Sequence, residues 1–548
     1  MNLPVTARRT VMDRIIGVFS PVAEYRRVSA RASTNLLTGG GYRAGGALNR
    51  IFGRWAPDPM SADAAYVPDM DAVRSRSRDS ARNHPIAAAA IGRQATSVVG
   101  TGLKAHPELN ADRLGLSESQ AEELEQEIAE DYDAYLSSTD PDASQRCTGY
   151  DQQDIVFRAT AKSGDIFPVH VMARDQQGRE HTTSFALFEA DRVSTPDHHF
   201  EGQRINDRGD RIVAGVEMDR IAAPIAYHML RKHPCDVQLD FRKEWVRVPK
   251  FSPSGQRQVN HVYFMTDPEQ TRGVPVLAPV LEQLKQVSDL SRAELFAAIL
   301  ASMVALIYKS PQGAALPNPF ERESAAAEEA ARQDPAGKLA VSKTGFQSGT
   351  VLELATDHDV TSPQLGRPNP EFDPFFISIV KQIGAAIEMP YEVLMLSFSN
   401  NYVPVRGSIE IFWQWVMKSR GWLARGHCDF VYHYWLAEQV MRGRYAMPGF
   451  FEDRLVRRLW SKVQHFGTAR ISLDPLRDAR SDEICEDRGW KFGGEITRER
   501  TGGDFWRKHR ERKREHTARV DAGLEAPVEH RERREESTTP PLLGSQND

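Results

Sequence analysis

The sequence predicts an α+β protein, because helical patterns precede and follow a block of short β-like runs. The block spans 165–267, where apolar runs of strand length are separated by Gly, Pro and Asp. Such runs are typical of an antiparallel or mixed sheet packed on helices. Apolar side chains recur at helical spacing within 74–99, 277–308 and 372–440. The 548 residues are enough for about three or four domains.

Composition restricts the class of protein. The net charge of −5 provides no overall attraction to nucleic acid or to an anionic membrane. The four cysteines lie far apart without CxxC spacing, which argues against a zinc site or a disulfide scaffold and indicates a reducing compartment. The longest apolar run, from Leu295 to Tyr308, is short for a membrane span. We therefore expect no membrane contact.

The first segment, 1–70, is rich in Gly, Arg, Ala and Ser and predicts a flexible basic arm. Its glycine run at 38–46 is not followed by Lys and Ser or Thr, so it is not a phosphate-binding P-loop. Contact of the arm with nucleic acid or with a partner protein stays open.

Two helices are expected before the β-rich block. The first is Ala-rich and ends near Val99, where Gly100 and Gly102 provide a turn. The second covers 117–136, and its Ser117 and Gln120 have the spacing of a capping box. The strands that follow are expected at 165–173, 183–193, 211–219, 224–230 and 260–267.

A long helix is expected after the turn at 272–275, reaching Tyr308. Its second half, from about Ala293, is apolar nearly all round and needs neighbours on several sides, from its own chain or from other subunits. An insertion at 310–345 and a strand at 349–355 come next.

A helix, a polar loop and a longer helix are expected between 369 and 440. Asp373 is the predicted N-cap of the first helix, and Pro390 is expected to end or bend it. Ser408 is the predicted N-cap of the second helix. Periodicity alone favours two core helices joined by a surface loop.

No catalytic constellation is visible. The chain has no GxSxG, HExxH or Walker pair, and His198 and His199 lack a third ligand at metal-binding spacing. The basic run at 507–515 is interleaved with glutamates, which favours a solvated helical face over a nucleic-acid surface. We expect no catalytic residue, no cofactor and no metal, and therefore no enzyme.

Several phrases in register resemble the lambda-type portal proteins of tailed bacteriophages. They lie at 76–103 (the Arg-Asn-x-Pro helix and VVGTG), 212–230, 261–299, 349–360 and 383–413. The resemblance covers about 70–490 in the order of the family. The family's small-residue run is replaced here by Asn400 to Arg406, in which Pro404 stiffens the backbone.

The resemblance implies a portal-type fold with an α/β wing, long stem helices, a small clip domain and a helical C-terminal crown region, assembled as a ring. The implied divisions are a flexible basic N-terminal arm (1–70), the wing (71–274), the first stem helix (275–309), the clip (310–371), the second stem helix (372–395), the tunnel loop (396–407), the long helix with completion of the wing (408–480), and a crown-like segment with a charged, partly disordered tail (481–548).

The implied function is that of a ring of about twelve subunits at one capsid vertex, assembled in the host cytoplasm. Double-stranded DNA is packaged through it by the terminase, is later ejected, and is contacted without sequence specificity. The implied partners are the terminase large subunit, the major capsid or scaffold protein and head-completion proteins joined at the head–tail interface. The alternatives are a non-enzymatic head–tail adaptor and a terminase-type packaging ATPase, although the latter needs a P-loop that the chain lacks.

The resemblance also implies two sets of functional residues. The tunnel loop would contribute Ser399, Asn400, Asn401, Tyr402 and Arg406 to the DNA channel. On the stem surface, Lys285, Asp289 and Arg292 would face either the lumen or an adjacent subunit. For Arg406, a phosphate contact, an intersubunit pair and a local pair on the long helix stay open.

Overall fold

The computed structural model divides into two units, Met1–Tyr66 and Val67–Asp548. The structure describes residues 59–173, 178–236, 243–303, 306–309, 351–354, 371–398, 402–470, 472, 474–503 and 505–524, with scattered positions between 12 and 28. In the first unit it describes α3 (Ala62–Tyr66), and most of the predicted arm lies outside the described residues. All elements discussed below belong to the second unit.

The Ala-rich region forms two helices where one was predicted. After the short η2 (Val67–Asp69), α4 (Met70–Asn83) and α5 (Pro85–Val98) are separated by His84, whose φ of −102° and ψ of 117° are extended. Pro85 disfavours the helical conformation at the preceding residue, which explains the break. The predicted end near Val99 is confirmed, and Gly100 and Gly102 have φ of 59° and 107°.

The predicted capping box at the start of the next long helix is confirmed. In α7 (Glu118–Ser137) the Ser117 hydroxyl accepts a hydrogen bond from the Gln120 N–H, and the Gln120 side chain accepts one from the Ser117 N–H. The short α6 (Ala111–Leu114) precedes α7, and α8 (Gly149–Ser163) follows it. β1 (Lys104–Pro107) pairs antiparallel with the distant β11 (Val463–Phe466).

The β-rich block forms two antiparallel sheets, so the predicted fold class is confirmed. The first sheet has the order β3–β2–β8 and the second the order β4–β5–β6–β7. The strands are β2 (Asp165–Met172), β3 (Thr183–Glu189), β4 (Arg211–Val213), β5 (Val216–Met218), β6 (Pro224–Leu230), β7 (Trp245–Pro249) and β8 (Val262–Tyr263), with η3 (Ala190–Arg192) after β3. The predicted strand at 211–219 is a hairpin of two short strands, and β7 was not predicted.

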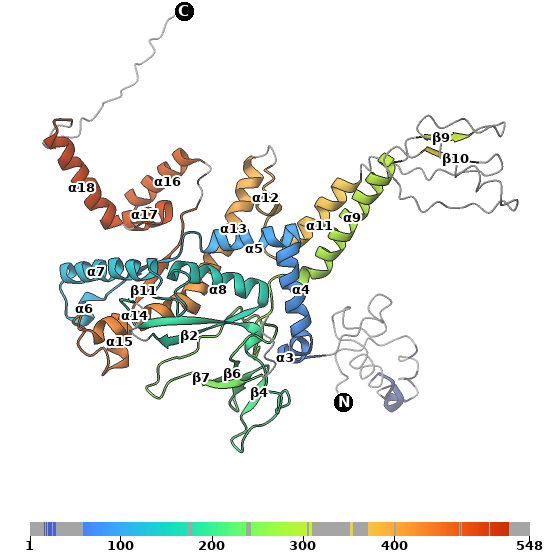
Figure 1. Ribbon diagram of the computed structural model, residues 1–548, viewed down its shortest axis with the longest axis horizontal. Coiled ribbons are helices and arrows are strands. Elements are labelled where there is room, and N and C mark those ends of the chain that lie inside the picture. The colour runs from blue at the N-terminus through green and yellow to red at the C-terminus, as the bar shows by residue number, and fades with distance from the viewer. Residues whose placement is uncertain are drawn as a thin grey trace, which may run out of the picture. The chain divides into compact units, whose positions relative to one another are not determined.

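Strand alternation on β2 creates a layered arrangement. Ile166 packs into the core formed with the helices, whereas Phe167 and Val169 pack with the second sheet. Figure 1 shows α8 along one side of β2 and the second sheet on the other. A third core joins α7 to the C-terminal half of the long helix through Tyr132 and Trp435.

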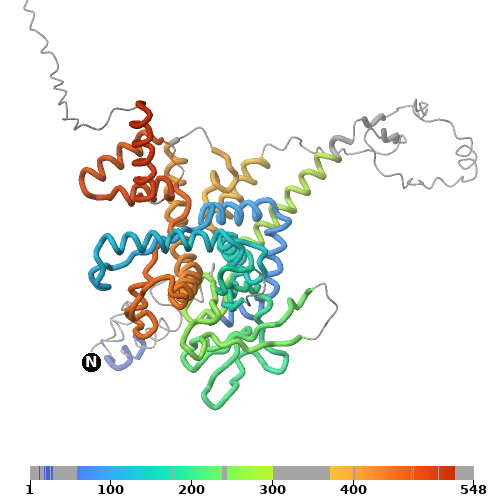
Figure 2. The backbone as a smooth tube through the Cα atoms, turned by 60° about the vertical axis from the view of Figure 1, so that its left-hand side comes forward, coloured from blue at the N-terminus to red at the C-terminus, as the bar shows by residue number. Residues whose placement is uncertain are grey.

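Two helices form a pair that leads away from the sheets, as Figures 1 and 2 show. After η4 (Ala278–Val280), α9 (Leu281–Met303) packs on α11 (Phe372–Ala386). The helix predicted to reach Tyr308 ends earlier, because β9 (Leu306–Lys309) pairs in parallel with β10 (Val351–Leu354). Helical periodicity could not detect a partner this far along the chain. The strand predicted at 349–355 is confirmed, and the other residues of 310–371 before Glu371 lie outside the described residues.

The long helix begins earlier than predicted. Helical structure runs through α13 (Tyr402–Leu423), the π-helix η5 (Ala424–Cys428) and α14 (Asp429–Met441). Ser408 is therefore inside the helix and is not its N-cap. Pro404 lies in the first turn, where a backbone N–H has no intrahelical partner, so proline is accommodated there.

The C-terminal part is helical. It contains α15 (Arg454–Trp460), α16 (Pro475–Asp487), α17 (Gly493–Thr501) and α18 (Phe505–Asp521). The tail predicted to be disordered lies, beyond Leu524, outside the described residues. Within the described part of the chain, no helix is long and apolar enough to cross a membrane.

A buried carboxylate joins the sheets to the helix pair. Asp165, at the start of β2, is 0% exposed and accepts hydrogen bonds from Arg272 (2.6 Å), Arg74 (3.0 Å) and Gly273 (3.2 Å). His261 Nε2 lies 3.1 Å from the same carboxylate. Burial by itself would raise the pKa of Asp165, but the two guanidinium groups and the His261 hydrogen bond hold this pKa well below its ordinary value. We refer to these side chains, Asp165, Arg74, Arg272 and His261, as the Asp165 cluster.

Replacing Asp165 by Asn should lower the free energy of unfolding by about 3–5 kcal/mol, because Arg74 and Arg272 would keep buried charges without an anion. Urea unfolding followed by circular dichroism measures this change. Asp154→Asn is the control, since the Asp154–Arg158 pair is about one-third exposed and such pairs contribute roughly 0–1 kcal/mol. Equal losses in the two variants would contradict the role of the Asp165 cluster.

The π-helix contains a buried histidine that should make stability depend on pH. His427 is 1% exposed, and burial together with His465 lowers the pKa of His427 to about 4. In the unfolded chain the imidazole of His427 binds a proton near pH 6.5, whereas in the folded protein it does so only near pH 4. The free energy of unfolding should therefore fall by roughly 3 kcal/mol as the pH drops from about 6.5 to about 4. His427→Leu should remove that part of the loss, and the exposed His198→Leu should not. Wild-type pH dependence in the His427→Leu variant would refute this assignment.

Candidate functional site

The region resembling a stem helix, tunnel loop and long helix is built around a break at Pro390. α11 ends at Ala386, Glu388 has a positive φ of 55°, and the short α12 (Tyr391–Met395) starts after Pro390. The predicted end of the helix before Pro390 is thus confirmed. The first helix starts at Phe372 with Glu371 as its N-cap, so Asp373 lies in the first turn and is not the cap.

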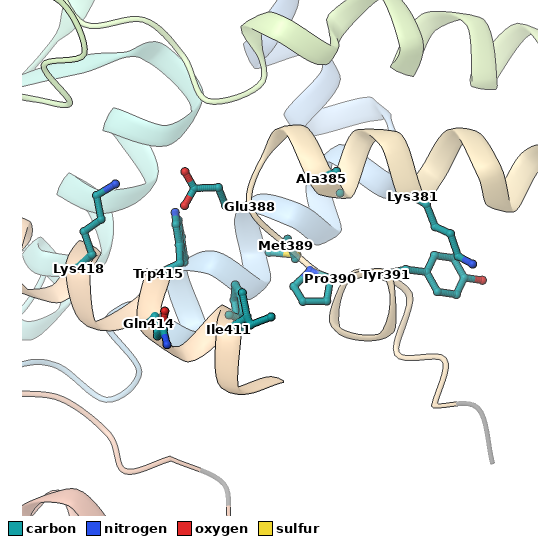
Figure 3. Close-up of a pocket in the computed structure, with 12 residues that line it drawn as sticks. Lys381, Ala385, Glu388, Met389, Pro390, Tyr391, Ile411, Gln414, Trp415 and Lys418 are labelled. Carbon is teal, nitrogen blue, oxygen red and sulfur yellow. The ribbon is translucent and has the colours of Figure 1, made fainter. Parts of the chain in front are cut away.

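A pocket of about 510 Å³ lies where α11, α12 and α13 meet. Figure 3 shows Lys381 and Tyr391 at one end, Lys418 at the other, and Glu388 with Trp415 between them. Lys381 Nζ is 5.7 Å from the centroid of the Tyr391 ring, a cation–π distance. Most of the remaining wall is apolar, and the pocket brings together no nucleophile with a neighbouring base.

The predicted tunnel loop is shorter than 396–407, because residues from Tyr402 onward are helical. Ser399, Asn400 and Asn401 lie outside the described residues. Leu396, with a φ of 51°, is the C-cap of α12 and marks the start of the connection. The α12–α13 loop is therefore residues 396–401, with Tyr402 as the first residue of α13.

Arg406 is held by carboxylates of its own chain. Its guanidinium lies 3.2 Å from Asp478 on α16 and 3.9 Å from Glu410 one helical turn away. Of the three roles left open by the sequence, the local pair is present in this structure. A guanidinium with two carboxylate neighbours is a poor free contact for a phosphate.

The Asp478 side chain gathers several partners. Arg500 Nη1 donates to it at 3.0 Å, the Ser472 hydroxyl donates at 2.8 Å, and Arg470 lies 3.7 Å away. The Ser472 bond, together with Arg500 and Arg406 and against the effect of burial, lowers the pKa of Asp478. We call Asp478, Arg406, Arg470, Arg500 and Ser472 the Asp478 cluster. It joins the start of α13 to α16 and α17, and sequence reasoning missed it because its members are far apart in the chain.

The three predicted stem-surface residues lie on one stripe of α9. Lys285 pairs with Asp289 at 2.6 Å, and both side chains are more than half exposed. Arg292 is exposed one further turn along. The opposite side of the helix carries the buried Leu284 and Val287. The stripe therefore faces away from the core of its own subunit.

The distal part of the helix pair leaves large apolar side chains in solvent. On α9, Leu295 and Phe296 are each 63% exposed and Ile299 is 41% exposed, and on α11 Phe375 is 57% exposed. The sequence prediction that this part of the helix needs several neighbours therefore has a structural basis, since the described residues leave these side chains exposed.

Arg420 anchors the long helix to α5 and to Thr468. Its guanidinium donates to the carbonyl oxygens of Val98 (2.9 Å), Ser97 (2.9 Å) and Thr468 (2.8 Å) and lies 4.9 Å from the Trp413 ring centroid. Two of these acceptors are at the C-terminus of α5, where free carbonyls attract a cation. Helix α13, which follows the α12–α13 loop, is thus fixed both to α5 and to the C-terminal helix α16.

No group of three or more His, Cys, Asp or Glu side chains in the described ranges is arranged to hold a metal ion. The described part of the region is a set of helices held in place by charged side chains.

Comparison with known proteins identifies the class. A family model described as "Phage portal protein, lambda family" matches residues 48–420, more than half of the chain. The protein is thus a structural component of a phage particle, of the class found at the capsid vertex. It belongs to the lambda family of phage portal proteins.

Two relatives align over nearly the whole chain. Portal protein B of Escherichia phage lambda is 23% identical over 503 residues, which are 89% of this chain and 91% of the relative. The portal protein of Escherichia phage N15 is 22% identical over 515 residues, covering 91% and 94% respectively. The resemblance inferred from the sequence is confirmed.

Solved structures of gene transfer agent (GTA) particles also show similarity. One is the neck of an empty GTA particle computed with C6 symmetry, with a TM-score of 0.39 and 11% identity over 81% of this chain and 93% of that chain. Another is the virion of the native particle, with a TM-score of 0.36 and 12% identity over 85% and 96%. These scores are low, so the fold described above rests on the elements of this chain.

Replacing Asp478 by Asn should loosen the start of α13, because Arg406, Arg470 and Arg500 would lose a shared anion. Amide hydrogen exchange at residues 406–410 should accelerate by about tenfold. Asp487→Asn, at the exposed C-terminal end of the same helix α16, should leave this exchange unchanged. Unchanged exchange in the Asp478→Asn variant would show that the Asp478 cluster does not hold the helix.

Proposed function

We propose that this portal protein assembles into a closed ring of about twelve subunits and that double-stranded DNA enters and leaves the capsid through the ring. The observation that carries this proposal is the set of exposed apolar side chains on α9 and α11. Leu295, Phe296 and Phe375 would be solvated in an isolated subunit, each more than half exposed. Adjacent subunits around a ring would cover them.

The predicted divisions are part of the proposal. We assign the wing to 71–274, the stem to the helices within 275–309 and 372–395, the clip to 310–371, and the crown to the helices that begin near 481. The tunnel loop is assigned to residues 396–401, a shorter segment than the predicted 396–407. Ser399, Asn400 and Asn401 form its tip in this assignment, and Tyr402 lies at its helical edge.

The chemistry of the α12–α13 loop suits a conduit. Phosphate contacts by Lys and Arg dominate DNA affinity, so a dense basic loop would resist translocation. Asn side chains offer weak, replaceable hydrogen bonds without fixing the register on the duplex. The pairing of Arg406 with Asp478 supports the view that Arg406 positions the helix and does not bind DNA directly.

The partners follow from this role. The terminase large subunit would drive DNA through the ring, the major capsid or scaffold protein would surround it, and head-completion proteins would join it to the tail. Assembly would take place in the host cytoplasm. In this proposal the protein has no catalytic activity of its own, and Lys285, Asp289 and Arg292 face either the lumen or an adjacent subunit.

Substituting Asn400 and Asn401 by Ala should leave the ring intact and lower the ratio of DNA-filled to empty particles, because weak contacts to passing DNA would be lost. Electron microscopy of particles counts both populations. The exposed Asn83→Ala, on α4, is the matched control and should package normally. Wild-type packaging and retention in the double variant would refute the assignment of the loop.

The same preparations distinguish the two alternative functions. ATP hydrolysis by the purified protein would indicate a terminase-type subunit. Attachment to the vertex only after DNA filling would indicate a head–tail adaptor, whereas a portal is present before filling.

A further inference from the structure

The last described helix, α18, has no buried residue. Its side chains include seven Lys or Arg and three Asp or Glu, which gives a net charge of 7 − 3 = +4. Four exposed basic side chains form no ion pair with any residue in the described part of the chain: Lys508, Arg512, Lys513 and Arg514. Phe505, at its start, lies against Gly493 and Gly494 of α17, whereas these four basic side chains are left exposed farther along the helix.

Helix α7 has the opposite charge. It contains eight Asp or Glu and no Lys or Arg, so its net charge is −8. Its inner face is buried through Ile128, Tyr132 and Leu136, and its outer face is acidic. Part of this acidic face is neutralised, because Glu127 and Asp131 pair with Arg444.

Three exposed carboxylates of α7 form no ion pair with the described residues: Glu118, Glu122 and Glu123. They occupy the first two turns of the helix, away from the pair with Arg444. One chain therefore carries two strongly charged helical faces of opposite sign, each with exposed and unpaired charges. Two such faces are electrostatically complementary, as the two sides of a protein–protein interface are.

Within one subunit the two helices meet through a hydrogen bond, from the Arg510 guanidinium to the Gln126 side chain. Both helices are labelled in Figure 1. This bond involves an uncharged partner and leaves the carboxylates of the first two turns of α7 unpaired. The acidic charge of α7 close to α18 also disfavours the approach of DNA phosphates.

We propose that the basic face of α18 docks on the acidic face of α7 of a second copy of this chain, forming a head-to-tail contact between adjacent subunits. The inference rests on the proposed ring. A closed ring uses two different patches on each subunit, and each patch binds the other patch of a neighbour. The pair α18 and α7 supplies two such patches, joined by exposed charges that salt can screen.

The test compares two charge-reversed variants. The first carries Glu122→Lys and Glu123→Lys on α7, and the second carries Arg512→Glu and Lys513→Glu on α18. Each variant alone places like charges opposite each other at every subunit contact. The protein concentration at half-assembly, measured by mass photometry, should therefore rise by about tenfold or more, and the increase should be smaller at about 0.5 M NaCl.

Mixing decides whether the contact lies between subunits. In an equimolar mixture the two variants can alternate around the ring. At one contact, Glu122 and Glu123 of the α18 variant then face the unchanged α18 of the α7 variant. At the next contact, the reversed α18 of one variant faces the reversed α7 of the other, and these charges are also opposite. The protein concentration at half-assembly should therefore return toward the wild-type value. Arg208→Glu, at an exposed position before β4, is the control variant and should assemble as the wild type does.

The other possible outcomes contradict either the contact between subunits or the proposed function. Wild-type assembly of both variants, or recovery only when all four reversals are in one chain, would overturn the contact between subunits. If the α18 variant assembled normally but packaged less DNA, DNA would be the partner of α18 and the inference would fail. A wild-type chain that forms no ring would instead contradict the proposed function.

Discussion

Asp165 is the constraint on which the arrangement of the whole structure depends. Its carboxylate lies at the start of β2, and its partners are Arg74 of α4, Arg272 in the segment between β8 and η4, and His261, the residue before β8. Arg272 also donates to the carbonyl oxygens of Ala190 and Val193 at 2.8 Å each. One buried anion therefore joins β2 and α4 to the segment that leads into the helix pair. Removing one member of such a cluster leaves a buried charge without its partner, which is strongly destabilising.

The second constraint acts at the other end of the site. The Asp478 cluster holds the beginning of α13, and Arg420 holds a later turn of the same helix to α5 and Thr468. Helix α13, which directly follows the α12–α13 loop, is thus fixed at two places. In the proposed ring, a loop presented by a fixed helix can surround DNA closely while contacting it weakly. Charged clusters therefore hold the scaffold, and the proposed function leaves the contact with DNA to the uncharged side chains of the loop.

The sequence predicted the features that depend on residues close together in the chain. The capping box at Ser117 and the helix end before Pro390 followed from short spacings, and both are confirmed. Long-range pairing was not predictable: the partners of Asp165 lie 91 and 107 residues away in sequence. The predicted loop, 396–407, is too long at its C-terminal end, because α13 starts at Tyr402 and Pro404 fits a first helical turn. For Arg406, charge alone could not distinguish a phosphate contact from an ion pair with a distant helix.

The central claim is that the subunits form a closed ring with the α12–α13 loop nearest its axis. A cryo-electron microscopy map of the purified, assembled protein tests it most directly. We expect a closed ring in which residues 396–401 line the narrowest part of the channel and the exposed apolar side chains of α9 are covered by an adjacent subunit. A map with these residues on the outer surface, or with Leu295 and Phe296 exposed to solvent in the assembled state, would contradict the account.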